Sequence, residues 1–88
     1  MIWKVEFDDR ARKELRRLDR QAQRGILAYL RNRIVTHEDP RRFGDPLRKN
    51  LSGFWKYRVG PYRVICEIQD GAVMVRVVRI GHRKNVYD

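Results

Sequence analysis

One stretch of the chain, residues 55–63, constrains the fold more than any other because it contains a complete hairpin signal. Its aromatic residues Trp55 and Tyr57 alternate with basic residues, which is the period-two pattern of a strand with one buried and one exposed face. The Gly60-Pro61 pair then interrupts the pattern, and a second alternating run follows. Glycine at the first position of a two-residue turn suits a type II′ geometry. The sequence therefore predicts a β-hairpin that turns at this pair.

A two-residue turn also fixes which residues face each other across the hairpin. Arg58 is expected directly opposite Arg63, and Lys56 is expected on the same surface. Like charges opposed in this way destabilise a sheet by about 0.2–1 kcal/mol per pair. Such a cluster is explained most simply if it binds an anion, and arginine presents a planar fork of donors that matches the oxygens of a phosphodiester.

Composition limits the chain to one small domain, residues 1–88, with a single modest core. A formal net charge of +10 predicts a polyanion or an acidic protein as partner, and nucleic acid is the commonest such partner. Cys66 is the one cysteine, so no disulfide can form within the chain, and it is expected to be a buried, inert thiol. The sequence contains neither a membrane-spanning apolar run nor a signal-peptide pattern, so a soluble cytoplasmic protein is expected.

The first half of the chain predicts a strand followed by two helices. Residues 2–7 alternate between apolar and charged side chains, and Asp8 or Asp9 is placed to cap the helix that follows. A second helix is expected over residues 21–35, with Gly25 inside it. Glycine costs about 1 kcal/mol in a helix relative to alanine, so its presence is interpreted as permitting close packing between the two helices. The helices should form an antiparallel hairpin.

The second half of the chain predicts a sheet. Residues 36–53 show little periodicity and are interpreted as a loop, anchored to the core by Leu47 and Leu51. The strand after the hairpin turn meets Asp70-Gly71, a type I′ turn signal, and is followed by a last strand. That turn would set three pairs opposite each other: Ile68 and Val73, Cys66 and Val75, and Val64 and Val77.

These elements predict an α+β fold in which a two-helix N-terminal hairpin packs on one face of a mainly antiparallel four-stranded sheet. The other face is expected to be a shallow cationic surface. Its residues should be Lys56, Arg58, Arg63, Glu67, Arg76 and Val78.

Beyond the last strand the chain reads Gly81-His82-Arg83-Lys84-Asn85-Val86-Tyr87-Asp88. Glycine is expected to end the strand, and the tail can then fold back beside the cationic face. It would bring an imidazole, a guanidinium and a phenol to that surface, from His82, Arg83 and Tyr87.

With these motifs the chain resembles the RelE toxin family of bacterial and archaeal toxin–antitoxin systems. The resemblance covers nearly the whole chain and is most specific at residues 57–63 and at Gly81-His82-Arg83 to Tyr87. It implies a RelE-like fold and a ribosome-dependent endoribonuclease that cuts messenger RNA in the A site. It also implies a cognate RelB-like antitoxin, whose helical segment wraps the toxin and neutralises it.

The resemblance also implies roles for individual residues. Lys56 and Arg58 match the family's basic pair before the turn, and Arg63 matches the arginine that starts the next strand. Arg83 and Tyr87 match a basic residue and a tyrosine of the family's tail. Arg63 and Arg83 would hold the scissile phosphate, while Lys56 or Arg58 would stabilise the leaving oxygen or donate to it.

The expected chemistry is attack by the 2′-hydroxyl of the RNA on its own phosphodiester, which needs a proton acceptor, a proton donor and cations. No group of His, Cys, Asp or Glu residues has metal-ligand spacing in the sequence, so neither a metal nor another cofactor is expected. The acceptor is His82, since imidazole titrates near neutral pH, or Tyr87, which can instead stack on a base. His82 can also simply cap the end of the strand.

Two other functions are compatible with the same residues. A ParE-like toxin shares the fold but inhibits DNA gyrase without RNA chemistry. A non-catalytic basic module would bind RNA, or only an acidic antitoxin. A nuclease that works without the ribosome is disfavoured, because no second histidine or carboxylate is placed for a self-sufficient acid–base pair.

Overall fold

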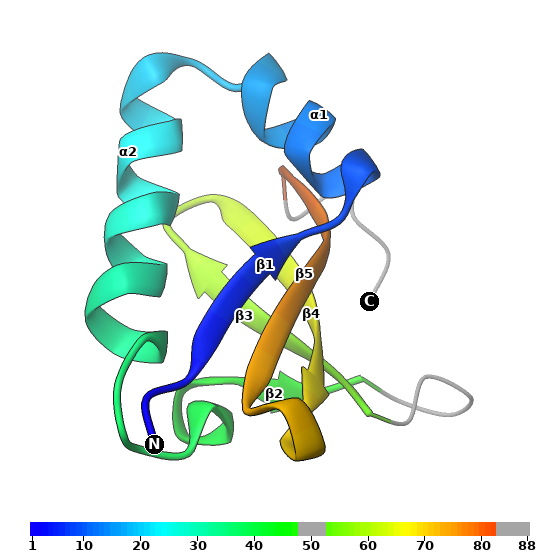
Figure 1. The fold of residues 1–88 in the computed structure, drawn as a ribbon. Coiled ribbons are helices and arrows are strands. Elements are labelled where there is room, and N and C mark those ends of the chain that lie inside the picture. The colour runs from blue at the N-terminus through cyan, green and yellow to red at the C-terminus, as the bar shows by residue number, and fades with distance from the viewer. Residues whose placement is uncertain (48–52, 83–88) are drawn as a thin grey trace.

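The computed structural model of the protein describes residues 1–47 and 53–82. These residues form two helices and a five-stranded sheet with the strand order β1-β5-β4-β3-β2. The strands are β1 (Lys4–Phe7), β2 (Asp45–Pro46), β3 (Phe54–Val59), β4 (Tyr62–Gln69) and β5 (Met74–His82). The helices are α1 (Asp9–Arg17) and α2 (Arg20–Tyr29), and shorter helical turns cover Leu30–Ile34, Pro40–Phe43 and Asp70–Ala72. Figure 1 shows α2 along one side of the sheet and α1 across one end of it.

The predicted α+β class and the mainly antiparallel sheet are confirmed, since β1 and β5 are the only strands that pair in parallel among the described residues. The sheet has one strand more than predicted, because Asp45–Pro46 pairs with β3. The interpretation of residues 36–53 as a plain loop is therefore wrong at this point. None of the helices within the two described ranges is long and apolar enough to cross a membrane.

Both helices begin at an aspartate whose carboxylate accepts a backbone hydrogen bond. Asp8 Oδ1 accepts from the Ala11 amide at 2.8 Å, and Asp19 Oδ1 accepts from the Ala22 amide at 2.7 Å. Such caps satisfy amides of the first turn that have no partner within the helix. Of the two candidate caps for the first helix, Asp8 is the one used. The second helix ends earlier than predicted, because the backbone passes into a π-helical turn at Leu30–Ile34.

Gly25 does not have the role that its position in the helix suggested. A Cβ atom built on Gly25 would meet no atom within 4 Å. The interpretation that this glycine permits close helix packing is therefore wrong, because the space beside it is open.

The main core lies between the helices and one face of the sheet. Burial leaves its aliphatic side chains and Tyr57 almost without exposed surface. It also raises the pKa of the Cys66 thiol, so the predicted buried and inert cysteine is confirmed as buried and protonated at neutral pH. The buried residues of this core are Ala11, Ile26, Leu30, Ile34, Tyr57, Val64, Cys66, Ile68, Val75, Val77 and Ile80.

Tyr57 attaches the segment before β3 to this core. Its hydroxyl group donates a hydrogen bond of 2.8 Å to the backbone oxygen of Pro40. Gly44 lies so close that a Cβ there would approach Tyr57 Cε1 to 2.9 Å and the Lys56 backbone oxygen to 3.1 Å. Only a residue without a side chain therefore lets Asp45 reach the edge of β3.

The register of the first hairpin agrees with the prediction. Val59 pairs with Tyr62, Arg58 with Arg63, and Lys56 lies opposite Ile65. Gly60 has φ of 59°, the positive value that the first turn position requires.

The register between β4 and β5 differs from the prediction. Asp70 to Ala72 form a 3₁₀ turn and Val73 adopts φ of 50°, so the connection is longer than the predicted type I′ turn. The predicted pairs are therefore wrong. In the structure Ile68 pairs with Val75, Cys66 with Val77 and Val64 with Ile80.

A β-bulge accounts for the last of these changes. The register shifts between Ile65 and Cys66, because Ile65 pairs with Arg79 while Cys66 pairs with Val77. Val78 is thus the extra residue of β5, and residues after it point to the opposite face from the one that strict alternation would give.

Candidate functional site

Three basic residues gather on the face of the sheet that points away from the core, here called the outer face. Arg58 lies directly opposite Arg63, and Lys56 is the next outward residue of β3. Arg58 is exposed, whereas Lys56 and Arg63 are half-buried and the Arg63 Nε atom is buried. The prediction that these three residues, the cationic cluster, share one face is confirmed.

Two carboxylates of the outer face pair with basic residues, one of which belongs to the cationic cluster. Asp45 of β2 is the cross-strand partner of Lys56, and Glu67 of β4 is the partner of Arg76. Directly paired residues have Cβ atoms about 4.5–5.5 Å apart, so the pairing places a carboxylate within reach of the Lys56 ammonium group. Asp45 could not be predicted from alternation, because it stands in a segment without any. The signal for a strand here was the proline beside it, since proline within sheets is typical of an edge strand.

His82 does not join the cationic cluster on the outer face. It pairs with Tyr62, and the two rings meet edge to face with centroids 6.1 Å apart. Tyr62 packs against the main core, so His82 points to the helix side, while Gly81 is the residue opposite Arg63. The expected placement of this imidazole on the cationic face is wrong, because β5 continues through Gly81 to His82 and the extra residue Val78 turns His82 to the helix side. Arg83 and Tyr87 lie outside the described residues.

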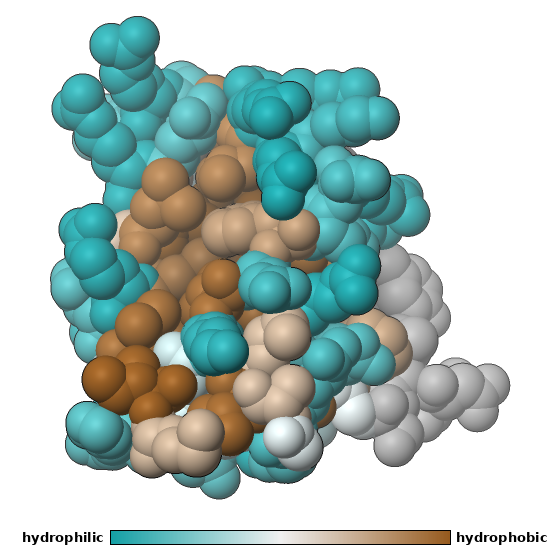
Figure 2. Space-filling view, in the orientation of Figure 1, coloured by the Kyte–Doolittle hydropathy of each residue, from teal (hydrophilic) through white to brown (hydrophobic). Residues whose placement is uncertain are grey.

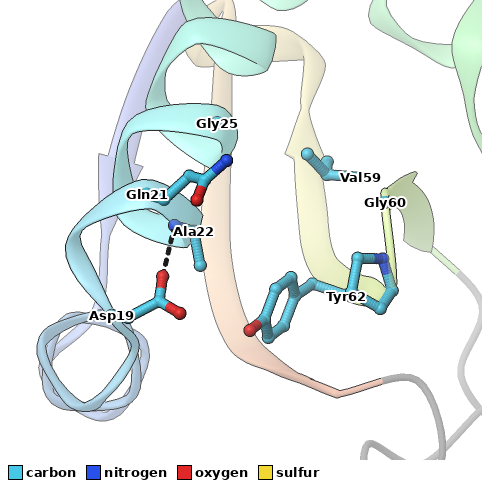
Figure 3. Close-up of a pocket in the computed structure, with 8 residues that line it drawn as sticks. Asp19, Gln21, Ala22, Gly25, Val59, Gly60 and Tyr62 are labelled. Carbon is cyan, nitrogen blue, oxygen red and sulfur yellow. Dashed lines mark hydrogen bonds between the residues drawn. The ribbon is translucent and has the colours of Figure 1, made fainter.

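The helix side contains its own hollow near Tyr62, shown in Figure 3. This pocket of about 370 Å³ lies between the N-terminal half of α2 and the Gly60-Pro61 turn. Gly25 and Ala22 form one wall and Val59 and Tyr62 the other, with Asp19 at the edge. It faces away from the cationic cluster, so it is separate from the candidate anion site.

The outer face has a second pocket, of about 310 Å³, here called the Phe54 pocket. Its apolar residues include a small cluster distinct from the main core, in which Leu47 and Ile65 are 8% and 4% exposed and pack with Phe54 and Val78. Leu47 thus anchors its segment as predicted, but to this outer-face cluster and not to the main core, and Leu51 lies outside the described residues. The charged residues at this pocket are Asp8, Arg10 and Arg79.

An apolar band crosses the side of the molecule where α2 meets β1 (Figure 2), framed by hydrophilic side chains. The exposed large hydrophobic residues are Leu27 of α2, Met1 and Ile2 before β1, and Val35 after the turn that follows α2. Contiguous apolar surface of this kind is typical of protein–protein contacts.

Comparison with solved structures places this architecture among toxins. The RelBE2 toxin–antitoxin complex from Mycobacterium tuberculosis matches with a TM-score of 0.85 at 29% identity, covering 94% of this chain and 100% of that chain. The isolated E. coli RelE toxin matches with a TM-score of 0.73 at 23% identity, covering 91% and 83% respectively. The helix-backed sheet is therefore a fold found among the toxins of toxin–antitoxin systems.

Sequence comparison identifies the family. Residues 5–87 match the family described as the ParE toxin of the type II toxin–antitoxin system, parDE. Toxin RelG of Mycobacterium tuberculosis is 30% identical over 87 residues, which is 99% of this chain and 98% of that protein. Toxin RelE of the same organism is 31% identical over 77 residues, 88% of this chain and 77% of that protein. The chain belongs to the RelE/ParE superfamily of type II toxins, as its motifs predicted.

Proposed function

We propose that this toxin is a ribosome-dependent endoribonuclease that cuts messenger RNA in the A site. The observation that carries the proposal is the cationic cluster, in which Arg58 and Arg63 are directly opposed on the outer face. Mutual repulsion of these guanidinium groups is relieved when a phosphodiester lies between them, and planar guanidinium groups match its oxygens. The similarity to toxins named RelE and RelG supports the same reading.

The proposed reaction is an internal transesterification of the RNA. The 2′-hydroxyl loses its proton and its oxygen bonds to the adjacent phosphorus, while the bond from phosphorus to the 5′-oxygen of the next nucleotide breaks. The products are a 2′,3′-cyclic phosphate and a 5′-hydroxyl, the latter formed by protonation of the leaving oxygen. Negative charge grows on the phosphoryl oxygens in between, and preorganised cations stabilise it.

Within this scheme Arg58 and Arg63 hold the phosphate, and Lys56 stabilises or protonates the leaving oxygen. Arg83 is a further phosphate ligand and Tyr87 the proton acceptor or a stacking partner, both by resemblance. Because His82 lies on the helix side beside Tyr62, it is disfavoured as the acceptor relative to Tyr87.

The test is primer extension on purified ribosomes programmed with a defined message. The wild-type toxin should cut within the A-site codon, and Arg63→Ala should slow cutting by about 10²–10³-fold, as expected when one transition-state donor is removed. Arg24→Ala is the matched control, since it removes the same charge from an exposed position on α2. Absence of A-site cleavage, or equal loss in the two variants, would contradict the proposal.

The partner in this proposal is an acidic, RelB-like antitoxin. Two features support this partner, the net charge of +10 and the apolar band over α2 and β1. An acidic antitoxin would neutralise the charge, and its apolar residues would cover the band. Co-expression with the product of the neighbouring reading frame should give a stable complex and abolish cleavage. A variant with polar residues at Leu27 and Val35 should bind the antitoxin more weakly.

Inhibition of DNA gyrase is the second candidate, and the family match described as ParE favours it. A supercoiling assay separates the two candidates, because a gyrase inhibitor blocks supercoiling and leaves ribosome-bound message intact. If neither activity is present and RNA binding falls steeply with salt, the chain is a non-catalytic basic module.

A further inference from the structure

The Phe54 pocket lies on the same face as the cationic cluster, yet the proposed phosphate chemistry does not use it. We propose that it is a subsite for one unpaired nucleobase of the RNA, next to the scissile phosphate. The inference rests on the proposed ribonuclease function. It adds a base-binding subsite to the phosphate-binding cluster, and this subsite would give the cleavage a sequence preference.

The lining of the pocket suits a flat heterocycle. Leu47, Ile65 and Val78 supply an apolar surface and Phe54 an aromatic ring. Unpaired bases in RNA complexes stack on aromatic rings and form hydrogen bonds through their polar edges. Donors for such an edge come from Arg10 and Arg79, and an acceptor comes from the Asp8 carboxylate.

The pocket is continuous with the cluster along two strands. Ile65 is the cross-strand partner of Lys56 and stands two residues after Arg63 in β4. Phe54 likewise stands two residues before Lys56 in β3. Two residues of a strand span about 7 Å, so a chain whose phosphate is held by the cluster has its neighbouring base within reach of the pocket. An apolar peptide would fill the pocket without using this adjacent positive charge.

The polar rim is held in place before any ligand arrives. Arg79 Nε donates to both oxygens of Glu14, at 3.1 and 3.3 Å, and Glu14 Oε1 also accepts from the Ile80 amide at 2.8 Å. These bonds use one of the five donors of the guanidinium group. Asp8 is fixed by its cap bond to Ala11. The bulge at Val78 brings both Val78 and Arg79 to the outer face, which strict alternation could not do.

The direct test is a titration of the methyl-labelled toxin, followed by NMR, with trinucleotides that carry a 2′-deoxy sugar at the cleavage position. Such probes cannot undergo 2′-hydroxyl attack, so the experiment measures binding alone. Methyl signals of Leu47, Ile65 and Val78 should shift, while those of Leu27 and Val35 on the helix side should not. Four probes that differ in one base should bind with different affinities.

A variant that removes the aromatic ring of Phe54 gives a second measurement. Phe54→Leu keeps an apolar side chain but removes the ring, and should weaken trinucleotide binding about tenfold, the usual size of one base–aromatic stack. On ribosomes the same variant should cut with reduced base preference. Phe43→Leu is the matched control, because it makes the same change at a phenylalanine that packs against the main core, and it should change neither quantity. Thermal unfolding of both variants verifies that they are folded.

The outcomes separate this inference from the ribonuclease proposal. If wild type cuts messenger RNA but the probes leave the three methyl signals unmoved, or Phe54→Leu binds as wild type does, the base subsite is overturned and the ribonuclease stands. If the probes bind in a Phe54-dependent way without any cleavage on ribosomes, the subsite stands and the ribonuclease does not. If only the antitoxin moves these signals, the pocket belongs to a protein contact and the inference is overturned.

Discussion

The two faces of the β3–β4 hairpin are made from alternate residues of the same strands, and they differ in almost every physical property. On the helix side Tyr57 and Val64 are fully buried in one continuous core. On the outer face Arg58 opposes Arg63, and a small apolar cluster lies beside them at Ile65. One face therefore stabilises the fold, and the other opposes two like charges at some cost in stability, as expected of the anion site proposed above. Substitutions at neighbouring positions should separate the two properties.

The largest expected effect comes from the helix side. Tyr57→Ala removes a fully buried aromatic side chain and should lower the free energy of unfolding by about 3–5 kcal/mol. Tyr57→Phe keeps the ring and loses only the hydrogen bond to Pro40, so about 1–3 kcal/mol is expected. Chemical denaturation measures both. Near-equal losses in the two variants would mean that packing of this ring contributes little.

A pair of glycines tests how tightly each part of the helix side is packed. Gly44→Ala forces a Cβ against Tyr57 and the Lys56 backbone and should destabilise by about 1–3 kcal/mol. Gly25→Ala adds a Cβ in open space within a helix and should stabilise by about 1 kcal/mol. Thermal unfolding of the two variants should therefore shift in opposite directions. A shift in the same direction would contradict the packing described for β2 and β3.

Alkaline pH should lower the free energy of unfolding through Tyr57, a buried group of the helix side. Burial raises the pKa of the Tyr57 phenol above its ordinary value of 10.0. The unfolded chain therefore releases this proton at a lower pH than the folded protein does, so stability is fully present below pH 10 and falls as the pH rises above it. Each pH unit should cost up to about 1.4 kcal/mol for this group. Between pH 9 and 11 the free energy of unfolding, measured by chemical denaturation, should fall less steeply in Tyr57→Phe than in the wild type.

The smallest effect on stability, and the opposite sign, is expected on the outer face. Arg58→Ala relieves the repulsion with Arg63 and should raise the free energy of unfolding by about 0.2–1 kcal/mol, most clearly at low salt. Cleavage on ribosomes should fall in the same variant. Arg24→Ala serves as control and should leave both nearly unchanged. A destabilised Arg58→Ala would mean that this residue supports the fold.

Sequence reasoning succeeded where the geometry is local. The Gly60-Pro61 turn has two residues, so the loop length alone determines the pairing of Arg58 with Arg63. The cap of the first helix depends on spacing within a few residues, and Asp8 was one of the two candidates predicted. The cationic cluster followed from these local rules.

Sequence reasoning failed where a connection or a strand contains more residues than its local motif indicates. Asp70-Gly71 alone resembles a two-residue turn, but Ala72 and Val73 extend the connection. Val77 and Val78 interrupt the alternation of β5 by placing two apolar residues together, and this signal of a bulge was available but not used.

Other features depend on distant parts of the chain. The parallel pairing of β1 with β5 joins segments about 70 residues apart, and no local pattern specifies it. The Phe54 pocket combines α1, β3, β4 and β5, so its lining residues could not be grouped beforehand. Phe54, Lys56 and Arg58 follow one another at intervals of two residues, and this spacing was the one local indication that they share a face.

The extra residue in β5 has a consequence for how this toxin can change in length. Val78 stands opposite no residue of β4, so its removal would restore regular pairing and leave Arg79 on the outer face and Ile80 in the core. Removing Val78 together with Arg79 would instead reverse the direction of every later side chain in the strand, so that Ile80 would leave the core and His82 would lie opposite Arg63. Deletion of Val78 alone should therefore be far better tolerated than deletion of the pair, because the parity of the residue count decides from which side of the sheet the chain departs.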